Sequence, residues 1–180
     1  MHWLEEVKRR LKNRNQLLFR KDSDFLQDLA LALASRSHRT LILWALGLTA
    51  GTVAELEARH PGERRPAEAL SAARAWAAGE LKMRPAQRSI LRCHALAKEL
   101  PSPADIAACH AVAQACSVVH TPGHALGYPI YDLTSLVRRL GVPACAAAVE
   151  ARKQAYFEML LYWEEQLPSY RGSWAAFLPE

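Results

Sequence analysis

The chain lacks the features of a β-rich, fibrous or disordered protein. No run of alternating β-branched residues stands out, and aromatic residues make up only 8% of the 180 residues. Eight glycines and ten prolines are too few for a collagen-like or low-complexity chain. Hydrophobic residues make up 51% of the chain, and alanine supplies much of that share. These absences leave a helical protein that is long enough to bury a core within one domain.

A membrane-spanning run and a secretory signal are also missing. The longest uncharged stretch, Thr40 to Ala54, is shorter than the roughly 20 residues that cross a bilayer, so we interpret it as a buried helix without membrane contact. The N-terminus passes directly into Glu5, Glu6 and a basic run, without an apolar segment and a cleavage site. The four cysteines lie in segments of helical periodicity: Cys93, Cys109, Cys116 and Cys145. Because they form no loop-rich disulfide framework, we expect a protein of the reducing cytoplasm.

The positive charge is concentrated near the N-terminus. The net charge is +5, and the first 22 residues hold seven basic residues against three acidic ones. Basic side chains can dock on nucleic acid phosphates, but here they are spread around an amphipathic helix. We therefore interpret them as a solvated helix face, and nucleic-acid binding is the weaker alternative.

Helical periodicity runs through most of the sequence and predicts an all-α fold, a single-domain bundle of seven or eight helices. A weak solenoid-like stacking of helix pairs is an open alternative, although no repeated signature appears. Besides an N-terminal helix, we expect helices over residues 25–34, 39–58, 66–82, 85–100, 104–120, 126–140 and 145–166.

Particular residues predict how these helices begin, bend and pack. Asp24 with Gln27 resembles a capping box, and Ser102 or Asp105 could cap the helix that follows Pro101-Ser-Pro103. Gly47 and Gly51, four residues apart, predict the close approach of a neighbouring backbone. Pro129 should kink the early part of its helix.

The most informative motif is the pair of histidines in His120-Thr-Pro-Gly-His124. On a continuous helix this spacing would place both rings on one face. Two such histidines can bind metal, move protons, recognise a partner, or be buried and hydrogen-bonded. Since Pro122 and Gly123 separate them, the motif falls at a helix junction more than on a plain ligand face.

A metal site is the alternative interpretation of the histidines and cysteines, and it would make the protein a metal-binding or metal-dependent enzyme. Its candidate ligands are His94, Cys116, His120 and His124. Zinc prefers such thiolate and imidazole ligands. However, the chain has no Cys-x-x-Cys and no His-Glu-x-x-His spacing, and Cys116 lies mid-stripe, as a core residue does. We therefore expect no metal and no cofactor.

Catalytic signatures are equally sparse. A nucleophile needs an adjacent base, and Cys116 with His120 is the one such pair at helical spacing, although a thiol in an Ala/Val helix is more typical of a core. Asp105 and Asp132 are the carboxylates nearest in sequence to the histidines, and no Gly-rich phosphate loop is present. Arg74 lies on a face that should be packed. Its side chain either extends to the edge or forms an ion pair at the base of a pocket beside Trp76.

From residue 38 to residue 131, about half of the chain, the order of features resembles a bacterial family. The relevant tracts are His38-Arg-Thr-Leu-Ile-Leu-Trp44, Arg65-Pro-Ala-Glu-Ala-Leu-Ser-Ala-Ala-Arg74-Ala-Trp76, His94-Ala and His120-Thr-Pro-Gly-His124-Ala-Leu-Gly. They resemble the Imm-five-like family of bacterial immunity proteins, whose members carry an Ala-Ala-Arg-Ala-Trp tract and a later His-x-x-x-His-Ala-x-Gly tract. Tyr128-Pro129 departs from the family, which usually has Ala-Ala there.

The resemblance implies a small all-helical cytoplasmic protein that binds and neutralises a cognate toxin domain, without catalytic residues. We divide the domain into an N-terminal helical extension (1–37), an immunity-like core (38–168) and an aromatic tail (169–180). The tail either covers the core or docks on a second copy in a homodimer. The residues expected to form a polar cluster, satisfied internally or facing the partner, are His38, Arg74, Trp76, His94, His120 and His124.

Overall fold

The computed structural model describes residues 2–179, and over this range the chain forms eight α-helices, two short 3₁₀ helices and no strand. The α-helices are α1 (His2–Lys12), α2 (Asp24–Ala34), α3 (His38–Arg59), α4 (Arg65–Ala77), α5 (Met83–Leu96), α6 (Pro103–Ser117), α7 (Gly127–Leu140) and α8 (Ala146–Gln166). The 3₁₀ helices are η1 (Pro122–His124) and η2 (Leu167–Ser169). The predicted all-α fold of seven or eight helices is confirmed.

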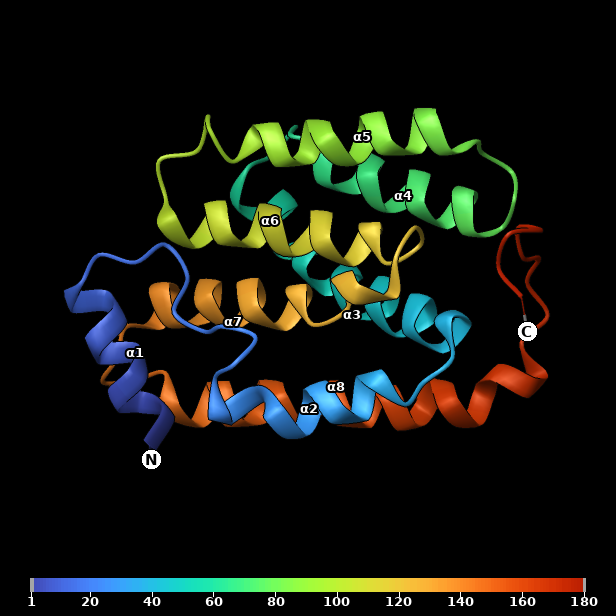
Figure 1. Cartoon of the computed structure of the whole chain (residues 1–180). Coiled ribbons are helices and arrows are strands. Elements are labelled where there is room, and N and C mark those ends of the chain that lie inside the picture. Colours follow the sequence, from blue (N-terminus) through green and yellow to red (C-terminus); the bar gives the residue numbers. More distant parts are fainter. Residues whose placement is uncertain (1, 180) are drawn as a thin grey trace.

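Helices α3 and α6 form the centre of the bundle. α3 contacts α4, α6 and α8, whereas α6 contacts α4, α5 and α7 as well as α3. Figure 1 shows α4 and α5 along one edge, α2 and α8 along the opposite edge, and α1 across one end. Because α3 contacts helices that are distant in sequence, the arrangement is a closed bundle and not a solenoid-like stack of helix pairs.

The core is built around Trp44 in the middle of α3. Its side chain is fully buried, and its ring meets Tyr128 of α7 and Tyr156 of α8 edge-on, each with centroids 6.4 Å apart. Trp44 Nε1 donates to the backbone carbonyl of Tyr156 at 2.9 Å. α3 is long and apolar enough to span a membrane on length and composition alone. Its burial by α4, α6 and α8 accounts for that character, as expected of a buried helix.

Capping residues and glycine determine where several helices begin and end, and hydrophobic periodicity alone did not predict all of these positions. Ser102 caps α6 by accepting from the backbone N–H of Asp105, which confirms one of the two predicted caps. The N-cap of α2 is Ser23 and not Asp24, so the predicted capping box is wrong. α4 ends at Ala77, before the expected residue 82, because Gly79 has φ of +81°, outside helical geometry.

Three predictions about glycine and proline are corrected by the structure. A Cβ at Gly47 would meet the side chains of Trp163 and Met159, and one at Gly51 would meet nothing within 4 Å. Neither glycine therefore serves the close approach of a neighbouring backbone. Pro129 lies in the first turn of α7, where a backbone N–H has no partner within the helix, so it produces no kink.

The aromatic tail folds back on its own chain. The backbone N–H of Ala175 donates to the carbonyl of Ala77 at 2.7 Å, and Leu178 is buried. Arg39 lies over the ring of Trp174, 5.1 Å from its centroid, and donates to the carbonyl of Leu178. Of the two alternatives for the tail, the structure therefore has it covering the core beside α3 and α4.

Candidate functional site

Four of the six predicted cluster residues line one surface pocket. Trp76 comes from α4, His94 from α5, His120 from the turn after α6, and His124 from η1. The pocket has a volume of about 330 Å³, and Gln87, Ile90, Leu91 and Ser117 complete its lining. The end of α6 at Ser117 and the turn through η1 bring His120 and His124 to the same opening, although they do not share a continuous helix.

Aromatic stacking forms one wall of this pocket. The ring of His120 stacks on Trp76 with centroids 6.0 Å apart and planes inclined by 20°. Trp76 is buried and also contacts Phe177 of the tail at 6.0 Å, whereas His120 is exposed. The wall therefore presents an imidazole to solvent over an indole that is fixed by the core.

His94 in the pocket lining is paired with His110, which lies outside the lining. His94 Nδ1 and His110 Nδ1 are 2.9 Å apart, so one ring nitrogen donates and the other accepts. The ring of His110 also packs against Tyr131 at 5.2 Å. Burial lowers the pKa of His94, and the neighbouring His110 and His124 lower it further. Burial likewise lowers the pKa of His110, which favours two neutral rings joined by one hydrogen bond.

A hydrogen bond to α6 orients the ring of His124. Its Nδ1 lies 2.9 Å from Oε1 of Gln114, so the ring nitrogen donates to the amide oxygen. A Cβ at Gly127 would lie 2.3 Å from that same oxygen, so glycine at this position leaves room for the Gln114 side chain. Burial, together with His120 and Lys21, lowers the pKa of His124.

The histidines predict a pH-dependent stability. Because the folded-state pKa values of His94, His110 and His124 are lowered, their contribution to folding is fully present above the ordinary histidine pKa of about 6.5. It is lost as the pH falls through the lowered values. We expect the free energy of unfolding, measured by urea titration, to fall by about 1 kcal/mol from pH 7.5 to 5.5, a modest change because water screens these partly exposed rings.

In the double variant His94→Gln/His110→Gln, the free energy of unfolding should fall less between pH 7.5 and pH 5.5 than it does in the wild type. The exposed and uncharged Asn13 provides the control, and Asn13→Gln should leave the dependence unchanged. Equal pH dependence in the double variant and the wild type would show that the histidine pair does not titrate with folding.

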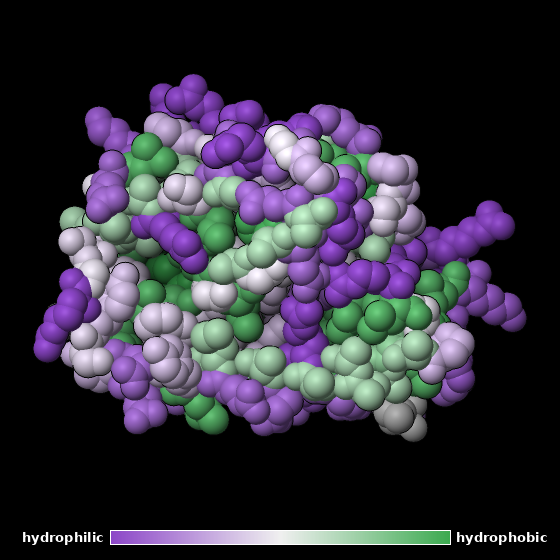
Figure 2. Space-filling view, turned by 180° about the vertical axis from the view of Figure 1, so that it is seen from behind, coloured by the Kyte–Doolittle hydropathy of each residue, from purple (hydrophilic) through white to green (hydrophobic). Residues whose placement is uncertain are grey.

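The other two predicted cluster residues lie elsewhere. His38 Nε2 donates to the carbonyl of Val118 at 2.6 Å, so it supports the chain just before His120 without lining the pocket. Arg74 is exposed and has no ion pair among residues 2–179, so an ion pair at the base of a pocket is not formed. It borders a separate hollow of about 560 Å³ between α3, α4 and the tail, and Figure 2 shows a recess with a hydrophobic floor on this face.

The structure does not bring the candidate metal ligands of residues 2–179 together into one site. Among residues 2–179, no three His, Cys, Asp or Glu side chains come together in a way that could hold a metal ion. Cys116 is fully buried and does not line the pocket, and burial raises the pKa of its thiol to about 12. Ser117, the hydroxyl at the pocket, donates to the carbonyl of Ala113 at 2.8 Å. The site therefore offers imidazoles beside aromatic and apolar side chains, suited to hydrogen bonding and packing.

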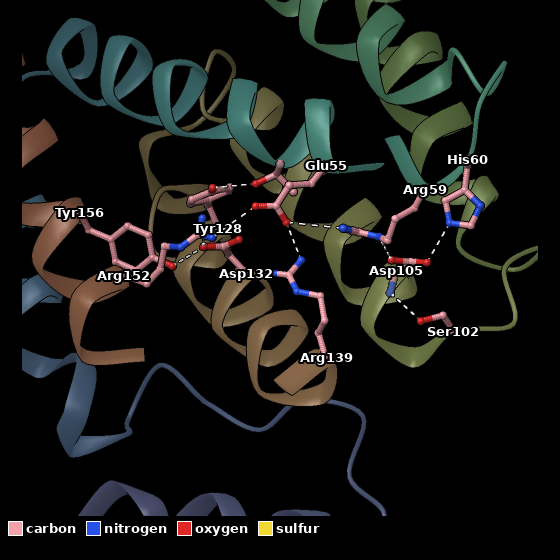
Figure 3. A network of polar contacts seen from close by, with 11 residues as sticks. Glu55, Arg59, His60, Ser102, Asp105, Tyr128, Asp132, Arg139, Arg152 and Tyr156 are labelled. Carbon is pink, nitrogen blue, oxygen red and sulfur yellow. Dashed lines mark hydrogen bonds and ion pairs between the residues drawn. The ribbon is translucent and has the colours of Figure 1, made fainter. Parts of the chain in front are cut away.

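A second polar cluster, which the sequence analysis missed, joins α3, α7 and α8 (Figure 3). Its centre is the buried Asp132, whose Oδ2 accepts from the Tyr156 hydroxyl at 2.6 Å and lies 3.4 Å from Arg152. Burial raises the pKa of Asp132, against the opposing effects of these two partners. Glu55 links Arg152 to Arg139. We call this set the Asp132 network, and it shares no residue with the histidine pocket.

Asp105, the other carboxylate near the histidines in sequence, also bonds elsewhere. It accepts from Arg59 Nε and from His60 Nε2, both at 2.8 Å, as Figure 3 shows. Neither Asp105 nor Asp132 is within the pocket lining. Among residues 2–179, the pocket histidines therefore have no carboxylate partner to orient or activate them.

The fold and the pocket define a small helical-bundle protein with an aromatic, histidine-lined surface recess. The chain belongs to the family described as "Imm-5 like putative immunity protein", whose family model matches residues 31–159. This match confirms the resemblance and extends beyond residues 38–131, from the end of α2 into α8. No curated protein and no solved structure matches the chain.

Proposed function

We propose that this protein binds a toxin domain and holds it inactive by direct protein–protein contact, without catalysing a reaction. The observation that carries the proposal is the family match over residues 31–159, because an immunity protein implies a toxin as its partner. The pocket supports a binding role, since its polar groups are imidazoles, the amide of Gln87 and a hydroxyl already bonded to backbone. As part of the proposal, the complex forms in the bacterial cytoplasm.

Titration separates binding from catalysis. As a further part of the proposal, the cognate toxin is encoded beside this chain's gene. That toxin domain is expressed in an assayable form, and its activity is measured as purified protein is added. A binder should abolish activity near one equivalent, immediately and reversibly. An enzyme that modifies the toxin would inactivate it below one equivalent, with progress over time. Full toxin activity at a large excess of this protein would sink the proposal, and a toxin domain from an unrelated locus serves as the control.

A further inference from the structure

Five basic residues lie on or beside α5, within a stretch of the chain that contains no acidic residue. Between residues 82 and 98 the chain contains no Asp or Glu, and its basic residues are Lys82, Arg84, Arg88, Arg92 and Lys98. All five are exposed. Among residues 2–179, Arg92 alone of the five has an ion-pair partner, Glu68 at 3.1 Å. Although the net charge of the chain after residue 22 is close to zero, this part of the surface is therefore strongly basic.

The basic N-terminal segment differs because carboxylates lie among its bases. Lys8 pairs with Glu5 at 2.7 Å, and Arg20 pairs with Asp22 at 3.0 Å. A partner that brings carboxylates to that segment would meet like charges as well as opposite ones. On α5 itself it would meet no carboxylate, since Glu68, the partner of Arg92, lies on α4.

One face of α5 has no helix against it. α5 packs on α4 and α6, and Figure 1 shows it along the outer edge of the bundle. Arg84, Arg88, Leu91 and Ala95 succeed one another at intervals of three or four residues, so they share a face. All four are exposed, and Leu91 is 63% exposed.

Leu91 connects this basic face to the histidine pocket, because it also belongs to the pocket lining. Protein interfaces characteristically combine a hydrophobic anchor site with a charged rim. A volume of about 330 Å³ is at the small end for ligand sites and suits an inserted side chain. A nucleic acid backbone would instead place phosphates over an exposed leucine, so the apolar centre favours a protein partner.

We propose that the toxin docks on the face formed by Arg84, Arg88 and Leu91 together with the adjoining pocket. The contacting segment of the toxin is acidic and carries an aromatic or aliphatic side chain that enters the pocket between Trp76 and His94. Its carboxylates pair with Arg84 and Arg88, since guanidinium groups bind carboxylates in a bidentate manner. This inference rests on the proposed function and names the surface that performs it.

Charge reversal at two places tests the surface. Binding to an inactive form of the toxin domain encoded beside this gene is measured by calorimetry for the wild type, Arg84→Glu/Arg88→Glu and Arg9→Glu/Lys12→Glu. Both double variants change the net charge equally and alter exposed residues that have no ion pair within residues 2–179. We expect at least about 30-fold weaker binding for the α5 variant and a change within about 3-fold for the α1 variant.

Leucine truncation tests the apolar centre in the same assay. Leu91→Ala should weaken binding about 5- to 30-fold, whereas Leu31→Ala, at a residue 73% exposed on α2, should have no effect. Absence of wild-type binding would overturn the proposed function itself. Wild-type binding that α5 charge reversal leaves intact would overturn this inference alone. A nucleic-acid partner for α5 would also overturn it. In that case the wild type would bind a 20-base-pair DNA duplex tightly, and the α5 variant would lose the DNA but still bind the toxin domain.

Discussion

Replacing Trp44 with alanine is expected to lower the free energy of unfolding by about 4 to 5 kcal/mol, the upper part of the range for a fully buried tryptophan. The indole is completely buried between Tyr128 and Tyr156, and its Nε1 donates to the Tyr156 carbonyl. Truncation leaves a cavity at the junction of α3, α7 and α8 and removes that donor. Urea unfolding, followed by circular dichroism, measures the loss.

Two further variants divide this effect into its causes. Trp44→Phe keeps most of the volume and removes the donor, so it should cost about 1 to 2 kcal/mol. Trp174→Ala makes the same truncation in the partly exposed tail, and it should cost about 1 kcal/mol. If Trp44→Ala costs no more than Trp174→Ala, Trp44 is not the centre of the core.

The helices could be predicted from the sequence because their signals are local. Apolar spacing, prolines and a capping serine act within a few residues, so the all-α fold and the Ser102 cap followed from pattern alone. The errors have longer-range causes. The space around Gly47 and Gly51 depends on which helix packs against α3, and no local pattern contains that information.

The histidine site could be predicted only in part. His94, His120 and His124 do line one pocket with Trp76, as expected of residues near adjacent helix ends. His110, the hydrogen-bond partner of His94, was not among the residues expected to form the polar cluster. The repeated dipeptides Cys93-His94 and Cys109-His110 carry a usable signal. The two cysteines meet in the core, with Cys93 Sγ donating to the Cys109 carbonyl at 3.5 Å, so the residues that follow them emerge side by side.

The Asp132 network gave no sequence signal because its members are scattered over three helices. Glu55, Asp132 and Arg152 are far apart in the chain, and each is unremarkable in its own helix. Only the packing of α3, α7 and α8 brings them together. Charged side chains in the middle of a helix sequence usually face solvent. A buried carboxylate is therefore apparent only once the tertiary structure is known.

Asp132→Ala is expected to lower the free energy of unfolding by about 2 to 4 kcal/mol. Its carboxylate is buried, and removing it leaves the Tyr156 hydroxyl and part of the Arg152 charge without a partner. The matched control is Asp28→Ala, because Asp28 is exposed and pairs with Lys153 at 2.8 Å. Exposed pairs contribute little, so this control should cost at most about 1 kcal/mol.

A double-mutant cycle with Tyr156→Phe isolates the hydrogen bond within the network. The coupling energy between the two substitutions should be about 1.5 to 3 kcal/mol, the range for a hydrogen bond to a charged group. Additive losses would mean that the Asp132 carboxylate does not depend on Tyr156 in the folded protein.

The same variant separates stability from toxin binding. Since the Asp132 network shares no residue with the pocket or with the outer face of α5, folded Asp132→Ala protein should retain wild-type affinity for the toxin domain. Binding is therefore measured at low temperature, where circular dichroism shows the variant to be folded. A large loss of affinity under these conditions would instead place the binding surface on the α3–α7–α8 side, since a network that shares no residue with the α5 face should not alter binding there.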